Sequence, residues 1–434
     1  MSEQSSASMF DYDARPVTPQ VVIVGLRASS VGYQIRDFLS RNGVPYEWVD
    51  IENPDRVQTV LDATDISFDR LPICLLPHGT QLATTTVEAV ATGLGLVSPP
   101  SLAEYDLTIV GAGPAGLAAA VYAASEGLRA VAIEAVAPGG QAGTTSMIEN
   151  YLGFPQGISG GELATRATAQ ARRFGAEILL ARPLVDIAKD GTGYVARLSD
   201  GTEVHSRSML VASGVEWRRL EVPGLDDLLG AGVYYGAGPS EAVSCRGCRV
   251  AVVGGGNSAG QAVVRFSRYA SHVTLLVRGS RLGDSMSQYL ATRVGQLDNV
   301  DIRTGTEIVE LEADSRLRAV VLSSPESTAP VRLPIESLFV CVGGIPRTQG
   351  LTTLGLATDE AGYLRTGAEV NAESGNESRW PLSRPPLPLE TNQPGLFAAG
   401  DVRSGSIKRC SSAIGEGSMA VALVHRRLAE IGGE

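Results

Sequence analysis

Gly111-Ala112-Gly113-Pro114-Ala115-Gly116 follows the apolar run 107–110 and leads into a run of small residues, 117–124. The glycines of such a fingerprint allow a tight turn, close approach of the backbone to a pyrophosphate, and close packing of a helix on a strand. The next apolar stretch, 130–133, ends in Glu134, 23 residues after the first glycine, where an acid accepts hydrogen bonds from a ribose diol. The pattern therefore predicts a strand–turn–helix unit that binds a dinucleotide at a helix N-terminus.

A second fingerprint, Gly254-Gly255-Gly256-Asn257-Ser258-Ala259, stands 143 residues further along the chain. It follows the apolar run 250–253, and the next strand, 272–277, ends in Arg278, 24 residues after the first glycine. An arginine there suits a 2′-phosphate, whereas Glu134 suits FAD or NAD. One fingerprint alone is often only a glycine-rich turn. Here two fingerprints occur, and each has a strand before it, a helix after it and a charged residue at the expected distance. Together they predict electron transfer between two dinucleotides.

Composition narrows the class of protein. The 434 residues are enough for two to four domains, and the net charge of −11 argues against a nucleic-acid surface. No apolar run approaches the ~18 residues of a membrane span. The polar start lacks a secretory signal, so residues 1–16 are predicted to be a disordered tail. Five cysteines, an odd number, point to a reducing, cytoplasmic location, and the four scattered histidines indicate no metal site.

Residues 17–98 are predicted to form a separate domain with the order β-α-β-α-β-β-α. The expected strands are 21–24, 46–51 and 73–76 with one more before the last helix, and the expected helices are 30–42, 54–63 and one ending at 96. This order resembles the thioredoxin or glutaredoxin fold, and Pro72 stands where that fold keeps a cis-proline. The fold's redox C-x-x-C belongs at the start of the first helix. Here that stretch reads Arg27-Ala28-Ser29-Ser30, so no thiol is available.

The remainder reads as a repeat of whole domains. After the first fingerprint, Asp190-Gly191 and Asp200-Gly201 separate three alternating stretches of a β-meander, and the second fingerprint is followed by a similar meander over 307–334. Residues 373–388, rich in Pro, Ser and Asn, are expected to be a surface excursion, and 415–431 a final amphipathic helix. The predicted fold is α/β, with two Rossmann-like dinucleotide-binding domains preceded by a thioredoxin-like domain.

The order of motifs over residues 104–434 resembles the low-molecular-weight thioredoxin reductase family. Besides the two fingerprints and Glu134, the motifs that carry it are Gly139-Gly140-Gln141, Glu149-Asn150-Tyr151-Leu152-Gly153, Ser213-Gly214, Gly400-Asp401 and Gly415-Glu416-Gly417-Ser418-Met419-Ala420. The resemblance implies an FAD-binding domain of two segments, 104–219 and 345–434, around an NAD(P)H-binding domain, 220–344. It also implies a homodimer, in which one domain swings against the other on the connections 216–220 and 343–347.

The resemblance further implies FAD and NADPH as cofactors. Asp401 would hold the ribityl chain of the flavin, and Gln141 and Asn150 would lie beside the flavin and its phosphate side. The family's NADPH site is only partly kept, because Val277 and Gly279 replace its histidine and its second arginine; NADH therefore stays an alternative. The expected cofactor residues are Gly111, Gly113, Pro114, Ala115, Gly116, Glu134, Gly140, Gln141, Asn150, Gly400 and Asp401 for FAD, and Gly254, Gly256, Asn257, Ser258, Ala259, Arg278 and Arg281 for NADPH.

One departure from the family concerns its chemistry. The family's redox C-A-T-C falls where this chain reads Gly236-Ala237-Gly238-Pro239, so both sulfurs are missing. A disulfide reductase of this type passes electrons from flavin through a dithiol to a partner. Nine residues further on, Cys245-Arg246-Gly247-Cys248 is a C-x-x-C, and Arg246 and Arg249 would lower a thiol pKa. We interpret it as two loop cysteines, with a relocated dithiol as the alternative; Cys74 and Cys341 lie in apolar strands and are expected in the core.

Lys408-Arg409-Cys410 stands where the family sets Arg-Gln-Ala against the flavin pyrimidine. A cation near flavin N1 and O2 stabilises the negative charge that develops there on reduction, so Lys408 and Arg409 are candidates for that role. The alternative is a solvated basic pair before a helix. Cys410 is interpreted as a small residue that fills space, with a redox thiol as the alternative.

The predicted function is an FAD-dependent NAD(P)H oxidoreductase that passes hydride from NADPH to flavin and then electrons to a non-dithiol acceptor. The acceptor would be oxygen, a quinone, a ferredoxin-like protein or a small organic substrate. One alternative is a thioredoxin-disulfide reductase or thiol oxidase that uses Cys245 and Cys248, or Cys410. Another is a flavin-bearing redox sensor or scaffold whose N-terminal domain binds a partner.

Overall fold

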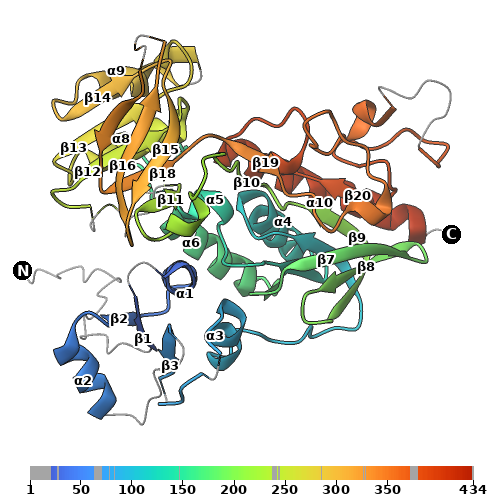
Figure 1. Cartoon of the computed structure of the whole chain (residues 1–434). Helices are drawn as coiled ribbons and strands as arrows, with labels where there is room; N and C mark the ends of the chain where they lie inside the picture. Colours follow the sequence, from blue (N-terminus) through green and yellow to red (C-terminus); the bar gives the residue numbers. More distant parts are fainter. Residues whose placement is uncertain are drawn as a thin grey trace, which may run out of the picture.

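Three parts make up the chain, each built on a β-sheet with its own helices, as Figure 1 shows. We call them the N-terminal unit, the first nucleotide unit and the second nucleotide unit. The predicted disordered tail lies outside the described residues. The structure is a computed structural model that describes residues 21–26, 29–62, 71–77, 79–82, 84–145, 147–236, 242, 245–284, 286–325, 327, 329–371 and 380–432.

The N-terminal unit is a three-stranded sheet in the order β2-β1-β3, with β1 parallel to β2 and antiparallel to β3. Its elements are β1 (Val21–Gly25), α1 (Ser30–Arg41), β2 (Tyr46–Asp50), α2 (Pro54–Asp62), β3 (Ile73–Leu75) and α3 (Val87–Gly93). Helix α1 begins where the Ser29 hydroxyl accepts a hydrogen bond of 3.0 Å from the Gly32 amide. Its residues Ile35, Phe38 and Leu39 are buried on one face, as the sequence periodicity predicts.

The predicted last strand of the N-terminal unit is wrong. In the part of it that the structure describes, only an isolated bridge joins Leu75 and Gln81. The Leu76 amide donates to the Thr80 carbonyl at 2.9 Å and closes a tight turn. Thr86 already caps α3 five residues after Gln81, so too little chain remains to extend a ladder.

The first nucleotide unit has the strand order β6-β5-β4-β9-β8-β7, with β20 also paired to β9. Strand β4 is buried at all six residues because helices cover the parallel sheet on its faces. Strands β7, β8 and β9 form the predicted meander. The elements are β4 (Tyr105–Val110), α4 (Pro114–Ser125), β5 (Ala130–Ile133), α5 (Gly140–Gly143), α6 (Gly160–Arg173), β6 (Glu177–Leu179), β7 (Leu184–Asp190), β8 (Gly193–Leu198), β9 (Glu203–Val211), β20 (Leu396–Ala398) and α10 (Cys410–Gly432).

Helix α10 packs closely on α4. A Cβ on Gly417 would lie 2.1 Å from the carbonyl oxygen of Ala115, so only glycine fits at this crossing. The helix begins at Cys410, five residues before the predicted start, because the Ala413 amide donates to the Arg409 carbonyl at 3.0 Å and already closes a turn. This crossing brings the C-terminal segment of the chain onto the helix of the first fingerprint.

The second nucleotide unit is a fully parallel sheet in the order β11-β18-β12-β13-β14, accompanied by the antiparallel meander β15-β16-β17. Because all five strands are parallel, their carboxyl ends meet at one edge. The elements are β11 (Val233–Tyr235), β12 (Arg249–Val253), α8 (Asn257–Phe266), β13 (His272–Leu276), α9 (Gln288–Gly295), β14 (Val300–Arg303), β15 (Glu307–Ala313), β16 (Leu317–Ser323), β17 (Val331–Pro334) and β18 (Ser337–Val340).

The chain crosses between the two nucleotide units at two short strands. They are β10 (Val215–Trp217) and β19 (Gly344–Pro346), which pair antiparallel and which we call the ribbon. They fall on the two connections predicted as hinges. Short 3₁₀ turns complete the structure, namely η1 (Asp226–Leu228), η2 (Leu282–Asp284), η3 (Thr352–Leu354), η4 (Gly367–Asn371) and η5 (Gly400–Val402).

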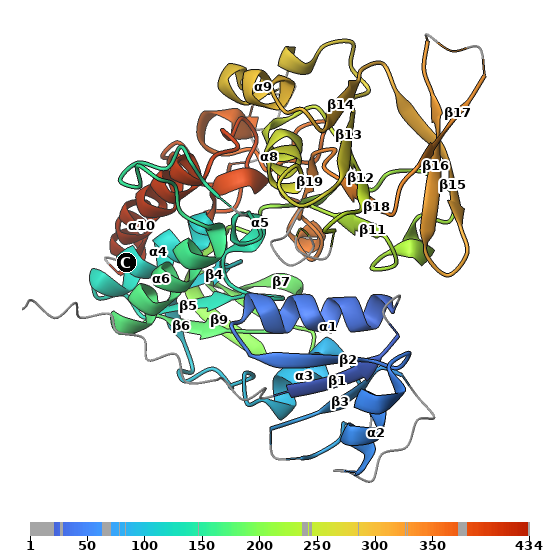
Figure 2. The ribbon, with the colours of Figure 1, turned by 90° about the vertical axis from the view of Figure 1, so that its left-hand side faces the viewer.

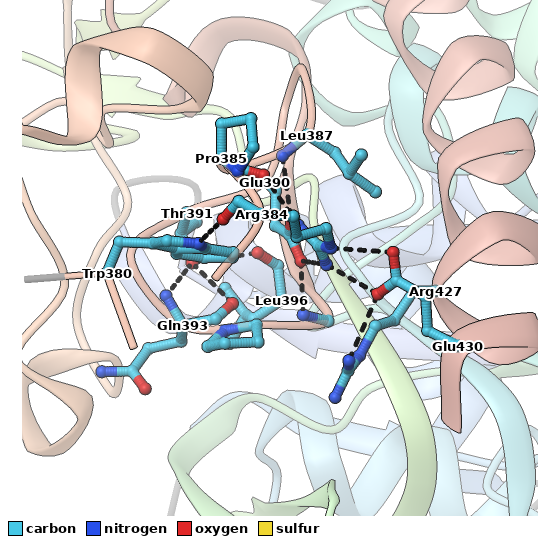
Figure 3. A network of polar contacts seen from close by, with 12 residues as sticks. Trp380, Arg384, Pro385, Leu387, Glu390, Thr391, Gln393, Leu396, Arg427 and Glu430 are labelled. Atoms are coloured by element: carbon cyan, nitrogen blue, oxygen red, sulfur yellow. Dashed lines mark hydrogen bonds and ion pairs between the residues drawn. The ribbon is translucent and has the colours of Figure 1, made fainter. Parts of the chain in front are cut away.

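The segment predicted as a surface excursion is anchored by buried side chains. Trp380, within this segment, is only 8% exposed. Its indole N–H donates to the Arg384 carbonyl (Figure 3), and Arg384 in turn donates to Glu390 at 2.8 and 3.1 Å and to Glu430 of α10 at 2.9 Å. Glu390 has no exposed surface and also accepts from two backbone amides, those of Leu387 and Gly395. The network ties this segment to the end of α10.

Candidate functional site

The first fingerprint makes a turn that only glycine permits. Gly111, directly after β4, has a φ of 101°, and a Cβ there would lie 2.6 Å from the Ala212 carbonyl oxygen. On Gly116, a Cβ would lie 1.9 Å from the Gly111 carbonyl oxygen. Helix α4 therefore starts directly against the end of β4, as the fingerprint predicts.

The N-terminus of α4 is suited to an anion. Gly113 is the N-cap and makes no side-chain cap, and Pro114 takes the first helical position. A Cβ on Gly113 would be in ordinary van der Waals contact with the Gly140 Cα at 3.9 Å. The first-turn amides of α4, without a side-chain cap, are the kind of group that binds a pyrophosphate.

A second glycine turn, Gly139–Gly140, lies next to Gly113. Gly139 and Gly140 have φ values of 101° and 53°, and the Gly139 amide donates to the Ala112 carbonyl at 2.7 Å. A Cβ on Gly140 would lie 3.1 Å from the Gly113 Cα. Gln141 follows and donates its amide to the Val215 carbonyl of the ribbon at 2.8 Å. We call Gly139–Gly140 the cofactor turn.

Glu134 is held rigidly at the end of β5. Its side chain is 7% exposed, and its two carboxylate oxygens accept hydrogen bonds from the amides of Ala112 at 2.8 Å and Val136 at 2.9 Å. Each oxygen keeps a further lone pair, so the carboxylate can also accept from ribose hydroxyls. The structure thus places Glu134 beside the first fingerprint, where the sequence predicts it.

Gly400 and Asp401, from the C-terminal part of the chain, lie next to the start of α4. A Cβ on Gly400 would lie 3.0 Å from the Ala115 Cβ. The Gly400 amide donates at 2.7 Å to Oε2 of Glu416, whose Oε1 pairs with Arg403 at 2.5 Å. Burial raises the pKa of Asp401, although the nearby Lys408 charge opposes the rise. Glu416 belongs to the motif 415–420, but the sequence predicts no role for it. Its contact with the Gly400 amide is visible only in the folded chain.

Of the two basic residues predicted to lie beside the flavin, Lys408 contacts the turn that carries Asp401. Its ammonium donates to the Asp401 carbonyl at 2.6 Å and to the Ser406 hydroxyl at 2.9 Å, and it lies 4.2 Å from the centre of the Tyr363 ring. Burial lowers the pKa of Lys408. Lys408 and Arg409 are both exposed, as is Asn150 in the turn after Ile148, so the contacts and not the exposure distinguish the two cations. Lys408 is thus the better placed of the two cations.

The thiol of Cys410 sits at the first residue of α10, half-buried. Burial raises its pKa, and the charge of Asp401 raises it further. A raised pKa keeps the thiol protonated and unreactive at neutral pH. This supports the interpretation of Cys410 as a residue that fills space.

The second fingerprint has the same geometry as the first. Gly254 has a φ of 144°, and a Cβ there would lie 2.2 Å from the Cys341 carbonyl oxygen. Gly256 is the N-cap of α8 without a side-chain cap, so the amides of the first turn face outward for an anion. Asn257 accepts a hydrogen bond of 2.7 Å from the Ser287 amide, Ser258 is exposed, and Ala259 is buried.

Arg278, directly after Val277 at the end of β13, lines an open hollow of about 410 Å³. The other lining residues are Gly305, Glu307, Ser323, Ser324 and Pro325. One cation and two hydroxyl groups suit a phosphate there, and one carboxylate opposes it. Arg281 is exposed and is not among the lining residues, so the structure does not bring the two arginines together in this hollow.

Cys245 and Cys248 lie at the amino edge of the second nucleotide unit's sheet. They precede β12 directly, and the Cys245 thiol, 2% exposed, contacts the hydroxyl of Ser337 at the start of β18 at 3.5 Å. Gly236 lies at the other edge, because it follows β11 and donates to the Val340 carbonyl at 3.0 Å. A five-residue strand separates the edges by about 15 Å. Ala237-Gly238-Pro239 lies outside the described residues.

The expectation that neighbouring arginines lower a thiol pKa at this C-x-x-C is wrong. Burial raises the pKa of Cys248, and the charge of Glu336 raises it further. The Arg249 guanidinium instead pairs with Glu336 at 3.4 Å. Cys74 and Cys341 are both buried in strands or at a strand end, as expected, and burial raises the pKa of each to about 12. In the described part of the chain, no group of three metal-ligating side chains is gathered.

No helix of the described residues combines the length and apolar composition that crossing a bilayer requires. The family model described as pyridine nucleotide-disulphide oxidoreductase matches residues 105–417. The N-terminal unit lies outside this match.

Several thioredoxin reductases are similar to this chain in sequence and in fold. The chain is 33% identical over 319 residues to a thioredoxin reductase of Listeria innocua, covering 73% of this chain and 91% of that protein. It is 32% identical to a thioredoxin reductase of Bacillus subtilis, covering 75% and 96%. Two solved thioredoxin reductases align with a TM-score of 0.66. That of Lactococcus lactis, in the FR conformation, is 26% identical and covers 75% of this chain and 99% of its own; that of T. acidophilum is 27% identical and covers 76% and 99%.

The family uses FAD and NADPH, and the glycine turns and open helix N-termini described above fit both. The chain belongs to the pyridine nucleotide-disulphide oxidoreductase family and is a thioredoxin reductase-like, FAD-dependent NAD(P)H oxidoreductase.

Proposed function

We propose that this oxidoreductase passes electrons from NADPH through FAD to an acceptor other than a dithiol of its own chain. The observation that carries the proposal is the position of the sulfurs. Gly236 stands at the carboxyl edge of the second sheet, the edge at which ligands bind in such sheets, and the C-x-x-C stands at the opposite edge. The acceptor classes are oxygen, a quinone, a ferredoxin-like protein or a small organic substrate.

The chain's own residues supply positioning and charge. The amides at the start of α4 and the cofactor turn would hold the FAD pyrophosphate, Glu134 a ribose, and Asp401 the ribityl chain. When bound, FAD supplies the chemistry of accepting a hydride. Lys408 and the N-terminus of α10 would place positive charge beside the flavin pyrimidine, which favours the reduced cofactor.

NADPH is proposed over NADH. Arg278 with Ser323 and Ser324 lines a hollow at the end of β13, where a 2′-phosphate would lie. Glu307 in the same wall opposes the phosphate and favours NADH. The ratio of kcat/KM for NADPH to that for NADH measures the outcome, and Arg278→Ala is expected to lower the value for NADPH alone.

The second candidate is a thioredoxin-disulfide reductase that uses Cys245 and Cys248. The names of the relatives favour this function over the first. The buried Cys245, the raised pKa of Cys248 and the distance from the carboxyl edge favour the first. The discriminating experiment mixes anaerobically reduced protein with a disulfide, a quinone, oxygen and a ferredoxin in turn. Disulfide turnover that disappears in the Cys245→Ser, Cys248→Ser double variant would establish the second function.

We infer that the N-terminal unit is a thioredoxin-like domain without a redox site. The β-α-β-α-β order supports the likeness, and the Leu71–Pro72 peptide bond is cis. Trp48 fills the space between the start of α1 and this proline: a Cβ on Gly25 would lie 2.9 Å from its ring and 3.1 Å from the Pro72 Cβ, and one on Gly32 would lie 3.1 Å from the ring. A large apolar ring there leaves no room for a disulfide of a substrate.

The domain limits 17–98, 104–219 with 345–434, and 220–344 remain proposals. The homodimer, the cytoplasmic location and the redox sensor or scaffold also stay predictions. For the sensor, tight redox-dependent binding of a partner together with slow turnover on every acceptor is the expected result.

A further inference from the structure

One end of α1 is seated firmly on the first nucleotide unit. Asn42, at the C-cap, donates to the Val136 carbonyl at 3.2 Å, and Arg41 donates to the carbonyl of Gly140 in the cofactor turn at 3.1 Å. Val136 and the buried Ala181 of the first nucleotide unit belong to the same apolar cluster as Ile35 and Phe38 of the N-terminal unit. The N-terminal unit therefore shares a core with the first nucleotide unit at this end.

The other end of α1 touches the second nucleotide unit. A Cβ on Gly230 would lie 2.9 Å from the Cβ of Tyr33, so the two backbones approach closely. The Tyr33 ring lies 5.7 Å from that of Tyr234 in β11, at 60°, and Tyr234 stacks on Phe339 of β18 at 5.1 Å. Such pairs stabilise a contact beyond the area they bury. Tyr33 is the outermost ring of a row that leads into the core.

Helix α1 is long enough to reach both units. Tyr33 and Arg41 are eight residues apart, a rise of about 12 Å along the helix. Figure 2 shows α1 running between the N-terminal sheet and the two nucleotide units, with one end towards β11.

In the described part of the chain, the ribbon and a surface ion pair also join the two nucleotide units. The ribbon is two strands of three residues, and an isolated pair of strands is marginal in water. Arg293 of α9 pairs with Glu149 of the first nucleotide unit at 3.0 Å, but both side chains are 38% exposed, and exposed ion pairs contribute little to stability. A contact anchored in two apolar cores therefore adds a further restraint on rotation about the ribbon.

We propose that α1 is a strap that holds the second nucleotide unit in one orientation relative to the first. Arg41 and Asn42 fix it beside the cofactor turn, and Tyr33 holds β11 through Tyr234. The reason for such a strap rests on the proposed function. If electrons do not pass through a dithiol of this chain, no sulfur pair has to move between flavin and partner. A single orientation of the second nucleotide unit relative to the first is then sufficient.

The test measures the distance between the two units in the full-length holoprotein. Ketone-bearing amino acids at the exposed positions Arg172, in α6, and Ser315, between β15 and β16, take spin labels by a reaction that leaves the native thiols untouched. Electron–electron distance measurements then report the orientation. The parent protein is expected to give one narrow distance distribution.

Tyr33→Ala is expected to broaden that distribution about twofold or more, or to add a second distance, because the ring pair with Tyr234 is lost. Tyr33→Phe, which keeps the ring, is expected to restore the parent distribution. Tyr289→Ala is the matched control, since Tyr289 is a 48%-exposed tyrosine on α9 away from this contact, and it is expected to match the parent. If the alanine variant does not fold, Tyr33→Leu keeps apolar volume without the ring pair and carries the same expectation.

An unchanged distribution in both Tyr33→Ala and Tyr33→Leu overturns the strap. So does equal broadening in Tyr289→Ala. The measured distances do not depend on any electron acceptor. Failure of the strap is therefore separate from failure of the proposed function, which is tested by the number of electrons that the holoprotein takes up.

Discussion

Glu416 accepts a hydrogen bond of 2.7 Å from the backbone amide of Gly400, and so fixes the turn that carries Asp401. The same carboxylate pairs with Arg403, which holds it in place. Because Asp401 is the residue proposed for the ribityl chain, Glu416 acts on the cofactor through the backbone of its neighbour and is a positioning residue.

Glu416→Ala is expected to weaken FAD binding about tenfold, because the Gly400 amide loses its charged acceptor and hydrogen bonds to charged groups contribute ~1.5–3 kcal/mol. Flavin fluorescence during titration of the apoprotein gives the dissociation constant. Glu360→Ala, a change at an exposed carboxylate, is the control and should bind FAD like the parent. Equal affinity in both variants would remove the role of Glu416.

Gly254→Ala is expected to abolish NADPH binding and to destabilise the second nucleotide unit by ~2–4 kcal/mol. Its φ of 144° suits glycine, and the added methyl would lie 2.2 Å from the Cys341 carbonyl oxygen. Gly283→Ala is the matched control, since a Cβ there meets nothing within 4 Å. Calorimetric titration with NADPH and thermal melting measure the two effects, and retained yellow colour shows that the FAD-binding part is intact.

Lys408→Met is expected to lower the flavin midpoint potential by ~10–20 mV, since a partly exposed charge contributes up to about 1 kcal/mol to the reduced form and ~30 mV corresponds to 1.4 kcal/mol. Arg409→Met, at the exposed neighbour, is expected to leave the potential unchanged. Burial lowers the pKa of Lys408, so its effect is complete at low pH and disappears as pH rises through that lowered pKa. A potential that moves more in the Arg409 variant would contradict this assignment.

Arg384→Met is expected to destabilise the protein by ~3–5 kcal/mol, because it leaves the fully buried carboxylate of Glu390 without its cation (Figure 3). Arg427→Met is the control: Arg427 pairs with Glu430 at 3.3 Å but leaves Glu390 paired, so a smaller loss is expected. Denaturant unfolding gives both values. Equal losses would mean that the pairing of Glu390 is not what stabilises this segment.

The pair Asp106–Arg129 predicts a pH dependence. Hydrogen bonds from Arg129 hold the pKa of Asp106 below its usual value of 3.8, against the opposing effect of burial. A lowered pKa in the folded state contributes stability that is present above the unfolded pKa and is lost as pH falls through the folded pKa. Asp106→Asn should therefore be less stable than the parent at pH 7, and the difference should shrink and vanish as pH falls through the lowered folded-state pKa of Asp106. A difference that persists below that pKa would show that the pairing is not electrostatic.

The sequence predicts those parts of the site in which one residue type is sterically required. Gly111, Gly116 and Gly254 each leave less than 3 Å for a Cβ, so a strand, a glycine turn and a helix recur at a fixed spacing. Glu134 and Arg278 follow because the ends of parallel strands meet at one edge. Each prediction depends on local geometry.

What the sequence does not predict depends on distant parts of the chain. Glu416 faces Gly400 only because α10 crosses α4, and Tyr33 reaches Tyr234 only because the N-terminal unit seats on Val136 and Ala181. Burial raises the pKa of Cys248 although arginines flank it, and the charge of Glu336 raises it further; Arg249 pairs with this glutamate, which is 87 residues away in the sequence. Neighbours in sequence do not report such partners.

The number of electrons that the holoprotein takes up tests the central claim most directly. Anaerobic titration with dithionite, followed at the flavin absorbance and by free-thiol counting, should end at about two electrons per FAD, with no change in thiol content. The Cys245→Ser, Cys248→Ser variant should take up the same number. Uptake of about four electrons by the parent, falling to about two in that variant, would mean that these cysteines form a redox dithiol and would contradict the proposal.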